Sequence, residues 1–163
     1  MATAKYIIRM KSKKSAGILL YKRIDGQLYI LLVHPGGPFW EGNDKGHWSI
    51  PKGEFTEEEN AFDAAIREFE EETATRLEGH FTELSPVKLK SGKIVYTWAL
   101  EGDINADTIV SNTFEIEWPP KSGTIKTFPE IDKAQWFTVE EALVKINEAM
   151  RDLILQLLAK IEP

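Results

Sequence analysis

The fold of this chain is decided by residues 53–74, which read GEFTEEENAFDAAIREFEEETA. The apolar residues of this segment recur at the spacing of one helix face: Ala61, Ala64, Ala65 and Phe69. The pattern predicts a helix that ends near Thr73. Thr56 and Glu59 have the spacing of a capping box, so we expect the helix to begin just after Thr56.

Four carboxylates crowd the last turn and a half of that predicted helix: Glu68, Glu70, Glu71 and Glu72. A helix C-terminus carries partial negative charge, so each acid there is unfavourable by roughly 0.3–1 kcal/mol. Glu68, Glu71 and Glu72 fall within an arc of about 100° on one face, while Glu70 points elsewhere. A solvated acidic face is one interpretation. The other is an oxygen-rich site for Mg²⁺ or Mn²⁺, which would turn the repulsion into attraction.

Apolar runs on the N-terminal side of this helix predict a β-hairpin. Ala16–Tyr21 and Leu28–Val33 flank Asp25-Gly26, and an Asp-Gly pair favours a tight turn between antiparallel strands. The second run is apolar throughout, which is typical of a strand covered on both faces. Before the helix we expect a loop at His34–Gly46 and a short strand at His47–Ile50.

More strands and a second helix are predicted after the acidic helix. The strands are residues 81–89 and 93–100, as a hairpin, then 114–118 and 134–137. The last helix is predicted to begin at Thr138, where Glu141 completes a capping box. We interpret it as a packing helix without chemistry, because its apolar residues keep helical spacing: Leu143, Ile146, Met150, Leu153, Leu157 and Ile161. The order of elements predicts an α/β fold in which helices cover a mixed sheet.

Composition narrows the class of protein. The length of 163 residues fits a single domain over residues 1–163. The absence of cysteine excludes a disulfide framework and a thiol nucleophile, and three histidines make a zinc site improbable. The net charge of −6 argues against nucleic-acid binding. No apolar run approaches the roughly 18 residues of a membrane span, so we expect no membrane partner and a cytoplasmic location.

Residues 1–15 are predicted to form a basic N-terminal arm. Seven Lys and Arg residues precede the first acid, Asp25. The arm is either solvated or a positive rim that attracts a polyphosphate. A transit peptide is a weaker third interpretation, because the segment has few Arg and Ser residues.

The acidic segment resembles the signature of the Nudix hydrolases. Gly53 is followed after five residues by Glu59, and after seven more by Arg67 and Glu68. Glu71 and Glu72 complete the charged positions of that motif. The motif ends differently, with Ala74 and Thr75 where the family usually has Gly and an apolar residue.

The resemblance implies a Nudix-type α/β/α sandwich and metal-dependent hydrolysis of nucleoside diphosphates linked to another group. It implies that the metal ligands are Glu68, Glu71, Glu72 and the backbone carbonyl of Lys52. Gly53 would shape the loop that enters the helix, and Arg67 and Glu59 would orient the carboxylates. For Glu59 a capping role remains an equal alternative. Arg67 reaches both Glu70 and Glu71 on a helix, so its partner stays open.

The general base stays open between two glutamates. One is Glu68. The other is Glu130, because family members often place a catalytic or ligating Glu in this later region, although an ordinary loop acid is the alternative. Glycine after a helix commonly takes a positive φ, which costs Ala74 roughly 1 kcal/mol. Either the helix ends differently here or that strain is tolerated.

Substrate choice is less visible in the sequence. Residues 48–53, WSIPKG, resemble the dinucleoside polyphosphate branch of the family. The Lys52 side chain would then meet a phosphate, and a lysine that faces solvent is the alternative. Phe39, Trp40 and Trp118 are either base-stacking platforms or core residues. The segment between Trp118 and Phe128 is expected to be a loop that could lie over a polyphosphate with its two lysines, Lys121 and Lys126.

The sequence therefore predicts an enzyme that splits diadenosine tetraphosphate or a related nucleoside polyphosphate. A broader nucleoside triphosphate or nucleotide-sugar pyrophosphatase is the first alternative. A non-catalytic Nudix module that senses a nucleotide is the second. A calcium-binding acidic helix outside this family is a distant fourth reading, because the chain lacks the ligand pattern of an EF-hand loop. The oligomeric state is not predicted.

Overall fold

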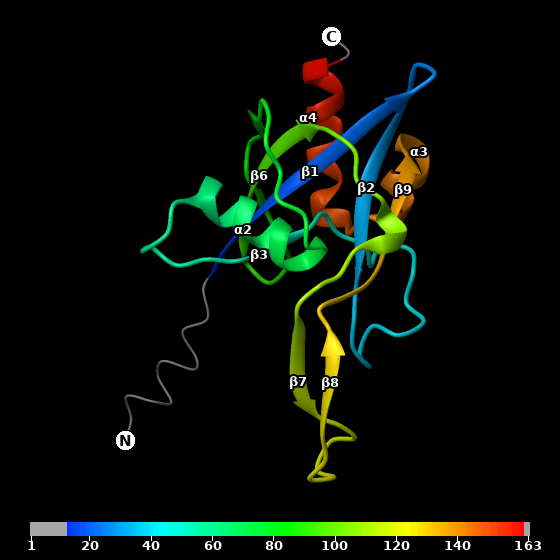
Figure 1. Cartoon of the computed structure of the whole chain (residues 1–163). Helices are drawn as coiled ribbons and strands as arrows, with labels where there is room; N and C mark the ends of the chain where they lie inside the picture. Colours follow the sequence, from blue (N-terminus) through cyan, green and yellow to red (C-terminus); the bar gives the residue numbers. More distant parts are fainter. Residues whose placement is uncertain (1–12, 162–163) are drawn as a thin grey trace.

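The structure, a computed structural model, describes residues 13–161 (Figure 1). Its strands are β1 Lys14–Ile24, β2 Gln27–Pro35, β3 Lys52–Glu54, β4 Thr82–Glu83, β5 Val87–Lys88, β6 Ile94–Glu101, β7 Thr113–Glu117, β8 Ile125–Pro129 and β9 Ile131–Thr138. Its helices are α2 Ala61–Thr73, α3 Val139–Lys145 and α4 Arg151–Ile161, with short 3₁₀ helices η1 Ala106–Thr108 and η2 Glu148–Met150. Most of the predicted basic arm, residues 1–12, lies outside the described residues, whereas Lys14 and Ser15 already belong to β1.

The central sheet is mixed, as predicted. Its strand order is β4-β6-β1-β2-β9, with β3 paired to β1 and β5 paired to β6. β1 runs parallel to β6 and antiparallel to β2, so the first predicted hairpin is confirmed. Its turn has positive φ at Asp25 (51°) and Gly26 (81°), which suits the twist of a two-residue hairpin. The second predicted hairpin is also present, with β4 and β5 as two short pieces that pair with β6.

Helices cover both faces of this sheet, which confirms the predicted α/β/α sandwich. Alternate residues of β1 point to opposite faces, so Ile18 joins the cluster around Phe69 of α2 while Leu19 joins the cluster around Leu153 of α4. Figure 1 shows α2 on one side of β1 and α4 on the other. This double coverage explains why the strand cores are apolar without alternation. In the described residues no helix is long and apolar enough to cross a membrane.

The start of α2 differs from the prediction. Asn60, not Thr56, caps the helix, and its side chain accepts hydrogen bonds from the backbone N–H groups of Phe62 and Asp63. The predicted capping box is therefore wrong, and Glu59 is free to make a different contact, described below. The predicted end at Thr73 is confirmed.

Two further element predictions were wrong. The expected strand at residues 47–50 is reduced to isolated bridges at Trp48 and Ser49, and the strand that joins the sheet is β3, after Pro51. The expected single last helix begins at Thr138 with the predicted capping box but ends at Lys145. The chain resumes helical structure as η2 and α4, because Ile146 forms a bridge with Trp48 and Asn147 donates its N–H to the Trp48 carbonyl.

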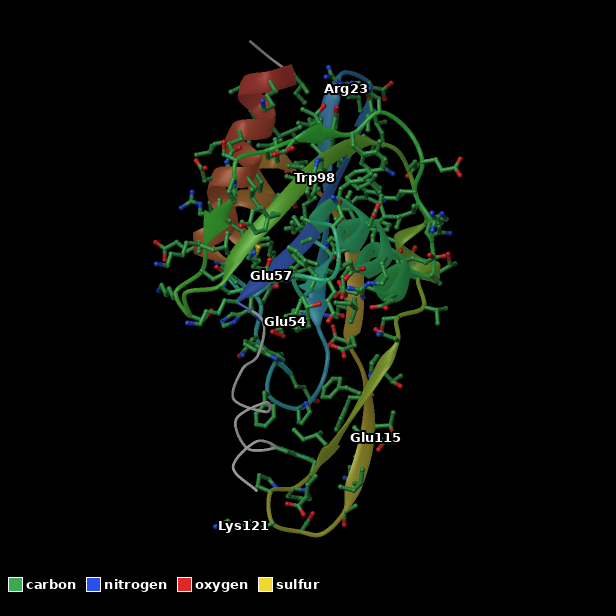
Figure 2. All side chains as sticks on the ribbon, turned by 90° about the vertical axis from the view of Figure 1, so that its left-hand side faces the viewer. Arg23, Glu54, Glu57, Trp98, Glu115 and Lys121 are labelled. Atoms are coloured by element: carbon green, nitrogen blue, oxygen red, sulfur yellow. The ribbon has the colours of Figure 1, made fainter. Side chains whose placement is uncertain are left out.

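The segment after Trp118 is not the loop expected over a polyphosphate. β7 and β8 pair as a two-stranded ribbon outside the central sheet, and Figure 1 shows it extending away from that sheet. Lys126 lies in β8, and Lys121 lies at the far tip of the ribbon, as Figure 2 shows. β7 confirms the strand predicted at residues 114–118, whereas β8 escaped prediction because it is largely exposed and lacks the apolar alternation of a half-buried strand.

Candidate active site

β3 and the C-terminal half of α2 approach each other where Gly53 faces Glu68. A Cβ atom on Gly53 would lie 2.0–2.5 Å from the carboxylate atoms of Glu68, so a larger residue would displace that carboxylate. Gly53 was expected to shape the loop that enters the helix. It instead lies within β3, where the absence of a side chain lets the Glu68 carboxylate approach the backbone closely.

Arg67 organises the glutamates around it. Its guanidinium holds Glu59 through two hydrogen bonds of 2.7 and 2.9 Å, and it donates to Glu68 (2.8 Å) and Glu71 (3.1 Å). Glu70 contacts Arg76 instead, at 3.6 Å. The partner left open by the sequence is therefore Glu71. The hydrogen bonds from Arg67 lower the pKa of the Glu59 carboxyl, and these carboxylates in turn raise the pKa of Arg67.

Glu72 is the carboxylate without such a partner. It is 9% exposed, and its Oε1 atom has no hydrogen-bond partner among the described residues. Burial raises the pKa of the Glu72 carboxyl to about 8, against the opposing effect of the Lys52 ammonium. Burial likewise raises the pKa of Glu68 to about 7, although Arg67 opposes it. Burial also lowers the pKa of Lys52. Lys52 and Glu72 line the floor of a pocket, where burial makes an ionised carboxylate unfavourable unless a cation lies beside it.

A cavity of about 300 Å³ opens above this floor. Its lining brings together four residues predicted from the sequence: Lys52, Glu72, Glu130 and Trp40. Glu130 lies between β8 and β9, where its N–H donates to the Asn112 carbonyl and its carbonyl accepts from the Gly36 N–H, both at 2.9 Å. Burial and the nearby Glu71 carboxylate raise the pKa of Glu130.

The two other predicted aromatic residues lie outside this cavity lining. Phe39 and Trp118 contact each other edge to face, with ring centroids 5.3 Å apart. Trp40 instead contacts His47, with ring centroids 6.0 Å apart, and both rings line the cavity.

Sequence reasoning missed part of the cavity wall. Asn147 and Met150 line it, although the last helix was interpreted as packing without chemistry. The break after Ile146 brings them there. A signal existed, because Asn147 followed by Glu148 resembles a helix start and could have predicted the interruption.

The residues present fit a hard divalent cation, although they do not form a finished cage. In the part of the chain that the structure describes, no group of three or more His, Cys, Asp or Glu side chains is arranged to hold a metal ion. The Arg67 guanidinium lies among these carboxylates and contacts oxygens of Glu68 and Glu71. The buried and unpartnered Oε1 of Glu72 is the oxygen that such a cation would satisfy.

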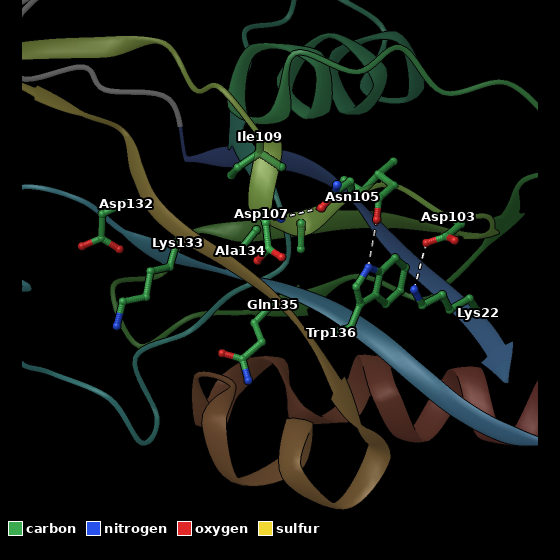
Figure 3. A pocket seen from close by; sticks show the side chains of 12 residues that line it. Lys22, Asp103, Asn105, Asp107, Ile109, Asp132, Lys133, Ala134, Gln135 and Trp136 are labelled. Atoms are coloured by element: carbon green, nitrogen blue, oxygen red, sulfur yellow. Dashed lines mark hydrogen bonds and ion pairs between the residues drawn. The ribbon is translucent and has the colours of Figure 1, made fainter.

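A larger cavity, of about 860 Å³, lies elsewhere, between β9 and the segment around η1 (Figure 3). None of the α2 glutamates lines it. Two polar contacts lie in its wall: Lys22 contacts Asp103 at 2.9 Å, and the Trp136 indole N–H donates to the Ile104 carbonyl at 3.0 Å. We therefore assign the chemistry to the smaller cavity.

Solved structures share this fold at low sequence identity. The Ap4A hydrolase of C. elegans, as a binary complex, has a TM-score of 0.61 and 22% identity, over 90% of this chain and 97% of that chain. The NUDIX domain of Shewanella oneidensis NrtR, complexed with ADP ribose, has a TM-score of 0.63 and 16% identity, over 99% of both chains. A mutT/nudix family protein from Listeria innocua has a TM-score of 0.59 and 19% identity, over 91% of this chain and 92% of that chain. None of the curated proteins matches the chain.

The family is settled by sequence. The model of the NUDIX domain matches residues 11–157, a range that contains the sheet, α2 and all of its glutamates. The chain therefore belongs to the NUDIX domain family, among the pyrophosphohydrolases that act on phosphoric anhydrides.

Proposed function

We propose that this protein hydrolyses a pyrophosphate bond in a nucleoside polyphosphate, with a dinucleoside polyphosphate such as diadenosine tetraphosphate as substrate and Mg²⁺ or Mn²⁺ as cofactor. The observation that carries the proposal is the buried, unpartnered Oε1 of Glu72 on the floor of the cavity, beside Lys52 and Glu130. A carboxylate so placed is unfavourable by itself and becomes favourable beside a cation.

The proposed ligands of the cation are Glu68, Glu71, Glu72 and the backbone carbonyl of Lys52. When bound, the cation would activate water and neutralise charge on the bridging phosphate oxygens. Arg67 would act as a positioning residue that holds Glu68 and Glu71, and Glu59 would in turn hold Arg67 through its two hydrogen bonds.

Glu130 would accept the proton of the attacking water. Its carboxyl lines the cavity with Glu72, and its raised pKa brings it toward the range in which a general base works best. Glu68 is the alternative base. Its carboxylate, however, is already held by Arg67 and packed against Gly53, which favours a ligand role.

The substrate assignment has three supports of different strength. Trp40 and His47 line the cavity and offer aromatic surface to a base, and Lys52 lies close to the glutamates with a cationic side chain for phosphate. Residues 48–53 resemble the dinucleoside polyphosphate branch. The fold is also that of an Ap4A hydrolase, although it is equally that of a domain that binds ADP ribose. A nucleotide sugar is therefore the second candidate substrate.

Phosphate release from dinucleotides, nucleotides and nucleotide sugars tests the proposal, with Mg²⁺ and with chelator. We expect Mg²⁺-dependent turnover that is greatest with diadenosine tetraphosphate. Glu72→Gln should lower kcat by orders of magnitude, whereas the matched control Glu70→Gln should not, because Glu70 only contacts exposed Arg76. Tight nucleotide binding without release from any compound would favour a sensor and refute the hydrolase. Calorimetry that shows no heat with Mn²⁺ would refute the metal ligands.

The proposal extends to the binding partners and the cellular location of the enzyme. We propose a small-molecule nucleotide as its partner, with no nucleic acid or membrane, and a location in the cytoplasm. Fractionation of cells that express the protein would test the location.

A further inference from the structure

One face of the β7–β8 ribbon is apolar and aromatic. Cross-strand partners point to the same face of an antiparallel pair, and Phe114 pairs with Phe128 while Ile116 pairs with Lys126. The opposite face carries Glu115, whose place on the ribbon Figure 2 labels. A two-stranded ribbon alone is marginally stable in water. An exposed apolar face on such a ribbon is typical of a binding surface.

The loop between β2 and β3 holds this face in a defined place. The Phe114 ring lies against Gly37, where an added Cβ would be 2.7 Å from its Cζ atom. Further out, Phe39 meets Trp118 edge to face. The Trp118 backbone is held in turn, because its main-chain N–H donates to the Thr124 carbonyl at 2.9 Å. The two rings are therefore a preformed pair between two segments far apart in sequence.

This pair is continuous with the candidate active site. Trp40 follows Phe39 in the chain and lines the cavity with Glu130, from which β8 leads back along the ribbon. Phe39 is 59% exposed and Trp40 is 42% exposed, so aromatic surface extends from the cavity outward. Thr124, whose carbonyl accepts from the Trp118 backbone N–H, lies six residue steps before Glu130, or about 20 Å of extended chain. A ligand that touches both must be long.

We propose that Phe39 and Trp118 bind the second base of a dinucleoside polyphosphate, while the first base lies in the cavity with Trp40 and His47. The inference rests on the proposed function and adds a second aromatic subsite to it. A polyphosphate with a base at each end could use both aromatic contacts, Trp40 with His47 and Phe39 with Trp118, whereas a nucleotide sugar has one base. Lys126 lies on the same face of the ribbon as Phe114 and Phe128 and adds positive charge to that face.

The test compares diadenosine tetraphosphate with adenosine tetraphosphate, which keeps the phosphates and lacks the second base. Phe39→Leu and Trp118→Leu should lower kcat/KM for the dinucleotide at least about fivefold more than for the mononucleotide, the lower end of what stacking on an aromatic ring contributes. Phe39→Trp should restore the ratio. Ile125→Ala is the matched control, because Ile125 is exposed on the other face of the same ribbon, and it should leave the ratio unchanged.

A binding arm separates failure of this inference from failure of the proposed function. Calorimetry with Ca²⁺ in place of Mg²⁺ measures the affinities of both compounds. If the protein hydrolyses neither compound but Phe39→Leu weakens the dinucleotide selectively, the subsite stands and the hydrolase proposal fails. Equal losses for both compounds, or no loss, would overturn the subsite. Sedimentation that shows a dimer which Phe39→Leu dissociates would also overturn it, because the face would then belong to a second copy of the chain.

Discussion

Replacing Ala74 with glycine should make this protein more stable. Ala74 follows α2 with φ 61° and ψ 22°, the left-handed conformation, and its N–H donates to the Glu70 carbonyl at 2.7 Å. The sequence left open whether the helix would end differently or would tolerate strain, and the structure shows that the strained conformation is adopted. A residue with a Cβ atom in this conformation costs roughly 1–2 kcal/mol. Glycine removes that cost but loses roughly 0.4–1 kcal/mol through its more flexible unfolded chain.

The net gain expected for Ala74→Gly is about 1 kcal/mol in the free energy of unfolding. For a domain of this size that raises Tm by roughly 2–4 °C. Urea unfolding and a thermal scan measure it, both with chelator present. Ala159→Gly is the matched control, since Ala159 is exposed inside α4, where the same change should cost roughly 0.5–1 kcal/mol. Turnover by Ala74→Gly should match wild type. If both substitutions destabilise equally, the argument from the left-handed conformation is wrong.

Three other perturbations have outcomes that the structure sets. Asn60→Ala should cost about 1 kcal/mol in urea unfolding, because α2 loses its cap. Gly53→Ala should lower turnover on the order of 100-fold with the circular dichroism spectrum intact, because the new methyl group displaces the Glu68 carboxylate. The N–H and hydroxyl of Thr138 lower the pKa of Glu141, so its stabilising effect is complete above the ordinary value of 4.5 and disappears as the pH falls below it. Tm measured from pH 7 to pH 3 should therefore fall more steeply for wild type than for Glu141→Gln, and parallel curves would contradict the assignment.

Local patterns predicted what depends on near neighbours in sequence. The acidic face of α2, its end at Thr73 and the Asp25-Gly26 hairpin all follow from spacing within a few residues. The start of α2 did not, because Thr56 and Glu59 satisfied the spacing rule for a capping box, while the residue that caps the helix, Asn60, lies four positions after Thr56. The Glu59 carboxylate instead accepts a hydrogen bond from Arg67, a contact that capping rules do not predict.

Long-range pairing decided the features that the sequence did not reveal. The apolar residues of the last segment keep helical periodicity through Ile146, where a bridge to Trp48, almost one hundred residues earlier, interrupts the helix. Because the helix is interrupted there, Asn147 and Met150 line the cavity wall. Nothing near residue 147 in the sequence contains the information that Trp48 will be its neighbour.

The acidic end of α2 is stabilised unequally, and this inequality indicates where a cation contributes most. Arg67 can neutralise Glu68 and Glu71 because Glu59 fixes its guanidinium through two of its N–H groups and leaves another N–H group to face both carboxylates. Glu72 lies further along the same face and receives nothing from Arg67. Its burial therefore opposes ionisation, Lys52 offsets this only in part, and a cation that enters the cavity would supply further positive charge. If Glu68, Glu71 and Glu72 are the ligands, as proposed, Arg67 already holds two of them, and Glu72 should contribute most to metal affinity.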